Sequence, residues 1–214
     1  MQVVRLVKTS DLQQVTKLIK KTGMGMTTMP KNKKEVQERI EWSIASANKK
    51  SANPNKETYL FVLENDKKII GISAIYTSIS KDKPSVFFKL KTIKLSSAAY
   101  NFEKEAETLQ LYLLHKPYSE LGTIFIDPAS RGRGRGSLLS FARLQLIASH
   151  QARFDKKILV EIRGWKDKNG KSYFWDSFSK AFFNLDFFSI DRLSYIDNHF
   201  ITESVPKFPF MVEL

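Results

Sequence analysis

The chain has 214 residues, of which 42% are hydrophobic and 12% aromatic, and it carries a formal net charge of +13. The absence of cysteine excludes a disulfide framework, a thiolate nucleophile and a cysteine-based zinc site. The positive charge favours an anionic partner, which can be a nucleic acid, a membrane surface or a phosphorylated small molecule.

The first half of the chain is predicted to form a strand, two helices and a β-hairpin. Ser10 is expected to cap the first helix, because Gln13 follows three residues later as in a capping box. Gly23 is expected to end this helix. The other elements are a strand over 3–7, a helix over 33–47, and hairpin strands over 58–63 and 68–76.

The second half is predicted to add a strand, a strand–loop–helix–strand unit and a final helix. The helix over 137–150 has apolar residues on most sides, so it is expected to be well buried. Strands are predicted over 86–93, 121–126 and 157–162, and the last helix over 172–183. This order predicts a mixed α/β (α+β) fold with one central sheet, in a single domain over residues 1–214.

The loop that opens the helix over 137–150 alternates arginine and glycine over residues 131–136. Glycines let backbone N–H groups converge and let a phosphate approach closely. The helix adds the positive end of its dipole, and Arg133 and Arg135 can add charge near a 3′-phosphate. The sequence therefore predicts an anion-binding loop.

Two other interpretations of this loop remain open. A glycine-rich turn is often only a turn, and alternating arginine and glycine also occur in RNA-binding segments. Those segments are long, repeated and disordered, whereas this one is short and lies between a predicted strand and a predicted helix. Phosphate binding is therefore favoured over RNA binding, and a nucleic-acid partner is not expected.

Arg131, Gly134 and Gly136 have the spacing R-x-x-G-x-G between a strand and a helix. This pattern resembles the acyl-CoA signature of the GNAT superfamily of N-acyltransferases. The resemblance implies a mostly antiparallel central sheet flanked by helices, with the CoA pyrophosphate on the loop amides and the pantetheine arm along the preceding strand. The implied cofactor-binding residues are Ile124, Phe125, Ile126, Arg131, Gly132, Arg133, Gly134, Arg135, Gly136 and Ser137.

Blocks along nearly the whole chain resemble the arginine N-succinyltransferase family, in the same order. The longest are K-T-G-M-G-M-T-T-M-P at 21–30 and S-E-L-G-T-I-F-I-D-P at 119–128. Others lie at 3–7, 59–64, 71–75, 136–140, 161–164, 174–175, 182–183, 185–187 and 206–207. The resemblance implies transfer of succinyl from succinyl-CoA to the α-amine of arginine, in arginine catabolism, with Ile124 contacting succinyl-CoA.

The chain departs from this family in several places. Residues 80–118 match weakly, arginines replace the Glu and Asn typical of the phosphate loop, and Phe208 stands where the family has a histidine. The family's proton-donor histidine lies in a C-terminal third that has no counterpart in these 214 residues. A natural short homologue, one subunit of a split enzyme and a truncated chain are all open.

Acyl transfer to an amine requires a base that accepts the proton of the amine. Glu161 is the candidate for binding or deprotonating the acceptor, although a structural ion pair with Arg163 or Arg143 explains it at least equally well. Arg163 can bind a carboxylate of succinyl or of the amino acid through two hydrogen bonds, or form a buried structural pair. The predicted acceptor-side residues, in a loop whose glycines can equally serve turns, are Thr22, Gly23, Gly25 and Thr27.

Four functions are therefore weighed. The leading one is succinyl transfer to arginine, and the second keeps the fold but uses another acyl-CoA or another small-molecule amine. The third is a non-catalytic CoA-binding subunit that pairs with a second chain, and the fourth is nucleic-acid binding. The three histidines lie far apart in sequence, so no metal is expected. No apolar run approaches the ~20 residues of a membrane span, so the expectation is a soluble cytoplasmic protein. Assembly with a second subunit or as a homo-oligomer is left open.

Overall fold

The computed structural model describes residues 1–22, 26, 28–50, 52–162, 164–165, 167–168, 171–178, 182–183, 185–186, 189–190, 193, 199–205, 207 and 210–211. The chain groups into two compact units. Unit 1 comprises Met1–Asp82 and Lys116–Ile162, and unit 2 comprises Lys83–His115 and Arg163–Leu214. The single domain expected over 1–214 stays a prediction.

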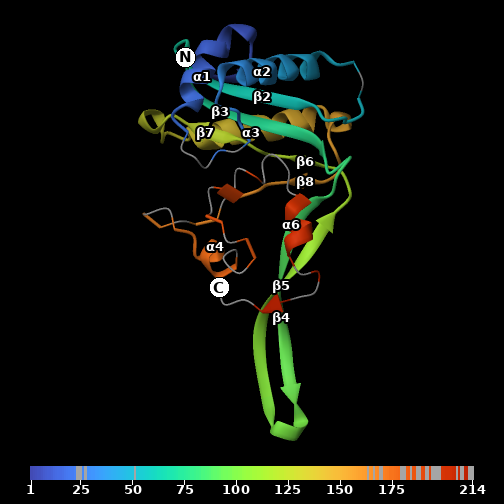
Figure 1. Ribbon diagram of the computed structural model, residues 1–214. Coiled ribbons are helices and arrows are strands. Elements are labelled where there is room, and N and C mark those ends of the chain that lie inside the picture. Colours follow the sequence, from blue (N-terminus) through green and yellow to red (C-terminus); the bar gives the residue numbers. More distant parts are fainter. Residues whose placement is uncertain are drawn as a thin grey trace. The chain divides into compact units, whose positions relative to one another are not determined.

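Unit 1 is built on a six-stranded sheet (Figure 1). The strands β1 (Gln2–Leu6), β2 (Thr58–Asn65), β3 (Lys68–Ile79), β6 (Tyr118–Glu120) and β8 (Ile158–Leu159) lie side by side in that order, and β7 (Ile124–Ile126) also pairs with β3. All pairs are antiparallel except β6 with β8, which is parallel. The predicted class, a mixed α/β fold with a mostly antiparallel sheet flanked by helices, is confirmed.

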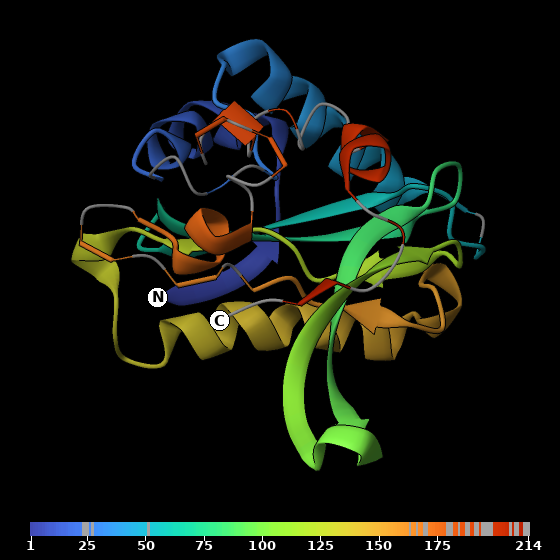
Figure 2. The same cartoon turned by 60° about the horizontal axis from the view of Figure 1, so that its bottom comes forward.

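Helices cover both faces of this sheet. α1 (Leu12–Ile19) and α2 (Lys33–Asn48) lie on one face and α3 (Arg135–Ser149) on the other (Figure 2). Side chains alternate along a strand, so Leu60 and Val62 of β2 join the core under α1 and α2, whereas Phe61 and Leu63 join the core under α3. Burial on both faces explains why β2 and β3 are almost continuously apolar.

The prediction that α3 is well buried is wrong. Leu139 is fully buried against the sheet, but Leu138, Phe141 and Leu144 are 44%, 64% and 41% exposed. One face of α3 packs on the sheet, and among the described residues of unit 1 nothing covers the opposite face. Apolar residues on most sides of a helix therefore did not indicate burial here.

The start of α1 also differs from the prediction. A short 3₁₀ turn, Thr9–Asp11, precedes α1, and the Asp11 carboxylate accepts a hydrogen bond from the Lys8 N–H at 2.8 Å. Arg5 donates to both oxygens of this carboxylate, at 2.7 and 2.9 Å. Asp11 therefore fixes this turn in place of Ser10, and α1 ends at Ile19, before Gly23, which lies outside the described residues.

Replacing Asp11 with Ala is expected to destabilise unit 1 by about 2–3 kcal/mol, because it removes a carboxylate paired with the largely buried Arg5. Burial alone would raise the pKa of Asp11, but the hydrogen bonds from Arg5 and Lys8 outweigh it and lower this pKa. The stabilisation is therefore present above the unfolded-state pKa and is lost as pH falls. Urea unfolding at pH 7 and pH 3 tests this, and an equal loss at both values would contradict it.

Unit 2 contains a long hairpin, β4 (Ser85–Ser97) and β5 (Phe102–Leu114), to which β9 (Phe210–Met211) adds at the outer edge of β5. No strand was predicted at β5. The first half of β5 is rich in charged residues, whose sign alternates over residues 103–105. Lys94 lies 3.9 Å from the carboxylates of both Glu103 and Glu105 across the hairpin. The described helices of this unit include α4 (Tyr173–Phe178), shorter than predicted, and α6 (His199–Ser204).

Candidate functional site

The strands β6 and β8 separate after a short contact. They pair at Ser119 with Ile158 and at Glu120 with Leu159, and the Leu121 N–H donates to the Leu159 carbonyl at 2.9 Å. β8 then ends, whereas the segment that follows β6 continues as β7, which pairs with β3. The predicted strands over 121–126 and 157–162 are therefore both shorter than expected, because the two segments diverge.

This divergence leaves one edge of β7 open. The Asp127 N–H donates to the Ile70 carbonyl and the Ala74 N–H donates to the Thr123 carbonyl. Backbone groups alternate in direction along an antiparallel strand, so those of Ile124 and Ile126 point away from β3. Among the described residues no strand pairs with this edge. The backbone of Phe125 faces β3, and its side chain packs in the core under α1 and α2.

A bulge at Gly122 marks the point of divergence. The Ala74 N–H donates to the carbonyls of both Gly122 and Thr123, at 3.2 and 3.0 Å, and Thr123 has a φ of 40°. The buried guanidinium of Arg143, on α3, donates to the Gly122 carbonyl at 3.1 Å. A Cβ at Gly122 would lie 2.6 Å from the Tyr76 ring and 3.0 Å from Glu120 Oε1. Any side chain larger than that of glycine would therefore require the Tyr76 ring to move.

Gly122→Ala is therefore expected to destabilise the protein by about 1–3 kcal/mol, because the added methyl group displaces the Tyr76 ring from a packed core. Chemical denaturation measures the change. Gly164→Ala is the matched control, since a Cβ there has nothing within 4 Å. Equal stability of the two variants would show that the close approach at Gly122 is relieved at no cost.

The predicted phosphate loop, residues 131–136, lies after β7 and runs into the start of α3. Gly132, Arg133 and Gly134 have consecutive positive φ values of 87°, 54° and 69°, which turn the backbone N–H groups toward one side. Gly134 is the N-cap of α3, and the N–H groups of Gly136 and Ser137 in its first turn have no intrahelical carbonyl to bind. A Cβ at Gly132 or Gly134 would have nothing within 4 Å, so the loop is open to an anion.

The three arginines of this loop have different surroundings. Arg135 donates to the Ser130 carbonyl at 2.8 Å and is half-buried, so it holds the loop together. Arg131 makes a long 3.5 Å contact with the Ile126 carbonyl and is exposed, as is Arg133. Arg131 and Arg133 are therefore the charges available to an incoming phosphate.

Two carboxylates lie where β6 and β8 end, and only Glu161 was singled out from the sequence. Burial, together with the charge of Glu161, raises the pKa of Glu120 to about 7. Glu161 lies two residues beyond β8 and is exposed over much of its surface, yet partial burial of its carboxyl raises its pKa too. The only sequence signal for Glu120 is an acidic residue in an apolar segment before the phosphate loop.

The loop after α1 reaches the same bulge. The Tyr76 hydroxyl and the Thr28 hydroxyl contact the Thr123 hydroxyl at 2.8 and 2.6 Å, and Tyr76 also donates to the Thr28 carbonyl. Tyr76 pairs across the strands with Glu120, so these two side chains share the α1 and α2 face of the sheet. Burial raises the pKa of Tyr76, which keeps its phenol neutral.

The other predicted acceptor residues are less informative. Thr22 is buried and donates to the Ile19 carbonyl at 2.7 Å, which is a structural role at the end of α1. Gly23, Gly25, Thr27 and Arg163 lie outside the described residues. Arg143 pairs with neither glutamate and instead binds Gly122 and the Ser140 hydroxyl.

The family model described as "Arginine N-succinyltransferase beta subunit" matches residues 2–214. The chain belongs to this family. It is 38% identical over 216 residues to the arginine N-succinyltransferase of Yersinia pestis (strain Pestoides F), covering 100% of this chain and 61% of the relative. It is 36% identical over 209 residues to the arginine N-succinyltransferase subunit beta of Pseudomonas aeruginosa, covering 97% and 61%.

A solved succinyltransferase subunit has the same fold. The structure of arginine/ornithine succinyltransferase subunit AI from Pseudomonas aeruginosa matches with a TM-score of 0.81 and 28% identity, over 100% of this chain and 63% of that one. The chain thus spans about three fifths of the length of these relatives. Among the described residues, no helix is long and apolar enough to cross a membrane, and no group of His, Asp and Glu is arranged to hold a metal ion.

Proposed function

We propose that the chain binds succinyl-CoA and takes part in succinyl transfer to the α-amine of arginine, in arginine catabolism. The observation that carries the proposal is the open edge of β7, which leads directly into the phosphate loop. A pantetheine arm has amide groups that pair with a strand edge, and a pyrophosphate suits converging N–H groups at a helix N-terminus. Membership of the arginine N-succinyltransferase family supports the choice of substrates.

The proposed path of CoA follows from these positions. The pyrophosphate would rest on the N–H groups around Gly134 and Gly136, with the charges of Arg131 and Arg133 nearby. The pantetheine arm would pair with Ile124 and Ile126 and bring the thioester toward Gly122. The acceptor amine would then approach from the α1 and α2 face, where Tyr76, Thr28 and Thr123 form a hydrogen-bonded group.

Glu120 is the proposed general base. The amine nitrogen forms a bond to the thioester carbonyl carbon, the carbon–sulfur bond breaks, and CoA leaves as a thiolate. The proton lost by the amine passes to Glu120, whose pKa of about 7 suits a base at neutral pH. Glu161, the base expected from the sequence, would act by keeping the pKa of Glu120 high. The roles of Gly23, Gly25, Thr27 and Arg163 as acceptor-side residues stay proposals.

The test is CoA release by the purified chain from succinyl-CoA, with and without arginine. Ornithine and acetyl-CoA in parallel reactions test the alternative that the same fold uses another amine or acyl group, which the name of the solved relative makes specific. Arginine-dependent release supports the proposal. If CoA release is faster with another donor or acceptor, the proposed reaction type stands but the proposed substrates are wrong.

A CoA-binding subunit without turnover is the second candidate, because the Pseudomonas relatives are named as subunits. Thermal stabilisation by CoA without turnover, and turnover on adding a partner chain, would favour it. This second candidate includes assembly with a partner subunit or as a homo-oligomer. Under either candidate we propose a cytoplasmic location. Affinity for RNA or DNA that CoA does not compete away would instead favour nucleic-acid binding.

A further inference from the structure

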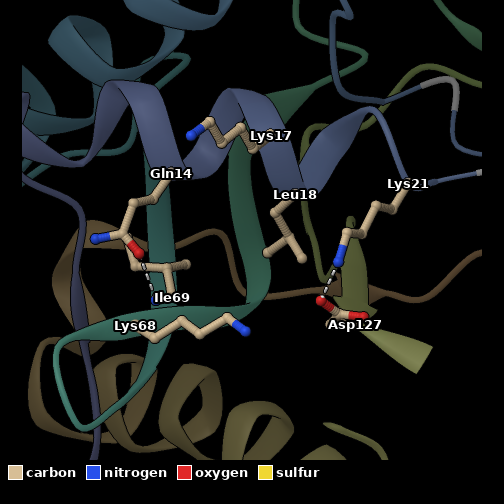
Figure 3. Close-up of a pocket in the computed structure, with 7 residues that line it drawn as sticks. All are labelled: Gln14, Lys17, Leu18, Lys21, Lys68, Ile69 and Asp127. Atoms are coloured by element: carbon tan, nitrogen blue, oxygen red, sulfur yellow. Dashed lines mark hydrogen bonds and ion pairs between the residues drawn. The ribbon is translucent and has the colours of Figure 1, made fainter. Parts of the chain in front are cut away.

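A second basic site lies in unit 1, on the α1 side of the sheet. A cavity of about 290 Å³ opens between α1, the start of β3 and the end of β7 (Figure 3). Its lining residues are Gln14, Lys17, Leu18, Lys21, Lys68, Ile69 and Asp127. The phosphate loop runs into α3, on the opposite face of the sheet, so this cavity is a separate feature.

The cavity has a fixed wall. Leu18 and Ile69 are buried and form its apolar floor. The Gln14 side chain joins α1 to the β2–β3 turn, because its oxygen accepts from the Ile69 N–H at 2.9 Å and its nitrogen donates to the Lys67 carbonyl at 3.2 Å. These two hydrogen bonds fix the start of β3, which carries Lys68, against α1, which carries Lys17.

The charges in the cavity are unbalanced. Lys21 Nζ contacts Asp127 Oδ2 at 2.5 Å, and this hydrogen bond lowers the pKa of Asp127, with a smaller contribution from the charge of Lys68. Within the described part of the chain, Lys17 and Lys68 have no ion-pair partner. Three lysines and one carboxylate thus line the cavity. In Figure 3 the ammonium groups of Lys21 and Lys68 extend toward the Asp127 side, whereas that of Lys17 lies along α1 on the Gln14 side.

We propose that this cavity binds a phosphate group in its doubly charged form, held by Lys17, Lys21 and Lys68. The excess of two positive charges matches a dianion, and ammonium groups bind phosphate oxygens as point charges. Two sources share this chemistry, free inorganic phosphate and the 3′-phosphate of CoA. The second source rests on the proposed function, and the first does not.

Asp127 connects this cavity to the phosphate loop. Its other oxygen accepts from the Ala129 N–H at 3.3 Å and so caps the turn Pro128–Ser130, which leads into the loop. A dianion would compete with Asp127 for Lys21. If CoA binds at the loop, as the proposed function requires, anion binding here is expected to change its affinity, and CoA is expected to change the anion's affinity by the same factor.

The first experiment titrates inorganic phosphate into the wild-type chain at constant ionic strength, followed by calorimetry and by the amide NMR shifts of Gln14 and Ile69. Lys17→Ala/Lys68→Ala is expected to weaken binding at least about tenfold, through loss of two charge-assisted contacts. Lys20→Ala/Lys33→Ala is the matched control, because it removes the same charge from exposed positions outside the cavity.

A second experiment separates the two sources by comparing CoA with 3′-dephospho-CoA. If the cavity holds the 3′-phosphate, the wild type prefers CoA, the Lys17→Ala/Lys68→Ala variant loses that preference, and phosphate competes with CoA. If it holds a free ion, the variant binds phosphate weakly but keeps the CoA preference of the wild type. The proposal is overturned if the two double variants behave alike in both experiments. A chain that binds phosphate but not CoA refutes the proposed function and leaves the site standing.

Discussion

Gly134→Asp is expected to weaken CoA binding by at least about a hundredfold, because a carboxylate beside the pyrophosphate costs several kcal/mol. Gly134 has a φ of 69° at the N-cap of α3, and its Cβ position is empty in the structure. The new side chain therefore meets no neighbouring atom, although the positive φ is strained for a residue with a Cβ. We expect its carboxylate to lie near the space proposed for the pyrophosphate. Calorimetric titration with CoA measures the effect.

Gly134→Asn is the matched control for this substitution. Asparagine has the same shape as aspartate, tolerates a positive φ, and carries no charge. The Asn variant is expected to keep most of the wild-type affinity for CoA and to unfold at a temperature similar to that of the Asp variant. If the Asp and Asn variants bind CoA equally well, the pyrophosphate does not lie at Gly134, whatever the activity of the chain.

Glu120→Gln is expected to lower kcat by about 10²–10⁴-fold, the usual effect of losing a general base, while CoA affinity stays unchanged. A base must be ionised, so wild-type activity should rise with pH through about 7, the pKa of Glu120. This rise should be absent in the variant. Full activity with an unchanged pH profile in Glu120→Gln would exclude Glu120 as the base.

Glu161→Gln provides a separate test of the same pair. The negative charge of Glu161 raises the pKa of Glu120, so its removal should shift the rising limb of the pH profile to lower pH. The carboxyl resonance of Glu120, followed by NMR, should shift in the same direction even in a chain without turnover. An unmoved resonance would mean that the two carboxylates are not coupled.

The pKa of Glu120 also affects stability. The folded state holds its proton between the unfolded-state value of about 4.5 and the folded value of about 7. Stability therefore falls as pH rises through this interval. Glu120→Gln should flatten this part of the stability curve.

Some of this architecture can be predicted from the sequence because its causes are local. The hairpin of β2 and β3 follows from two β-rich segments and a polar turn, and the position of the glycine-rich loop before α3 follows from glycines between a strand and a helix. β5 was missed because ion pairs across the hairpin, such as Lys94 with Glu103 and Glu105, replace an apolar pattern.

The environment of Glu120 could not be predicted, because distant segments create it. Tyr76 from β3, the end of β8 and Glu161 all surround one carboxyl. Its neighbours are therefore set by strand pairing and not by local sequence. The buried Arg143 is similar, since its partner Gly122 is 21 residues away.

The open edge of β7 has a consequence for how such a protein can change. A ligand that pairs with this edge is bound by peptide groups, and every amino acid except proline supplies the same ones. Replacement of the side chains at Ile124 and Ile126 would leave those contacts intact. Binding of such a ligand then tolerates substitutions along β7. The residues that contact the amine can change independently, so the acceptor specificity of homologues can change while acyl-CoA binding is kept.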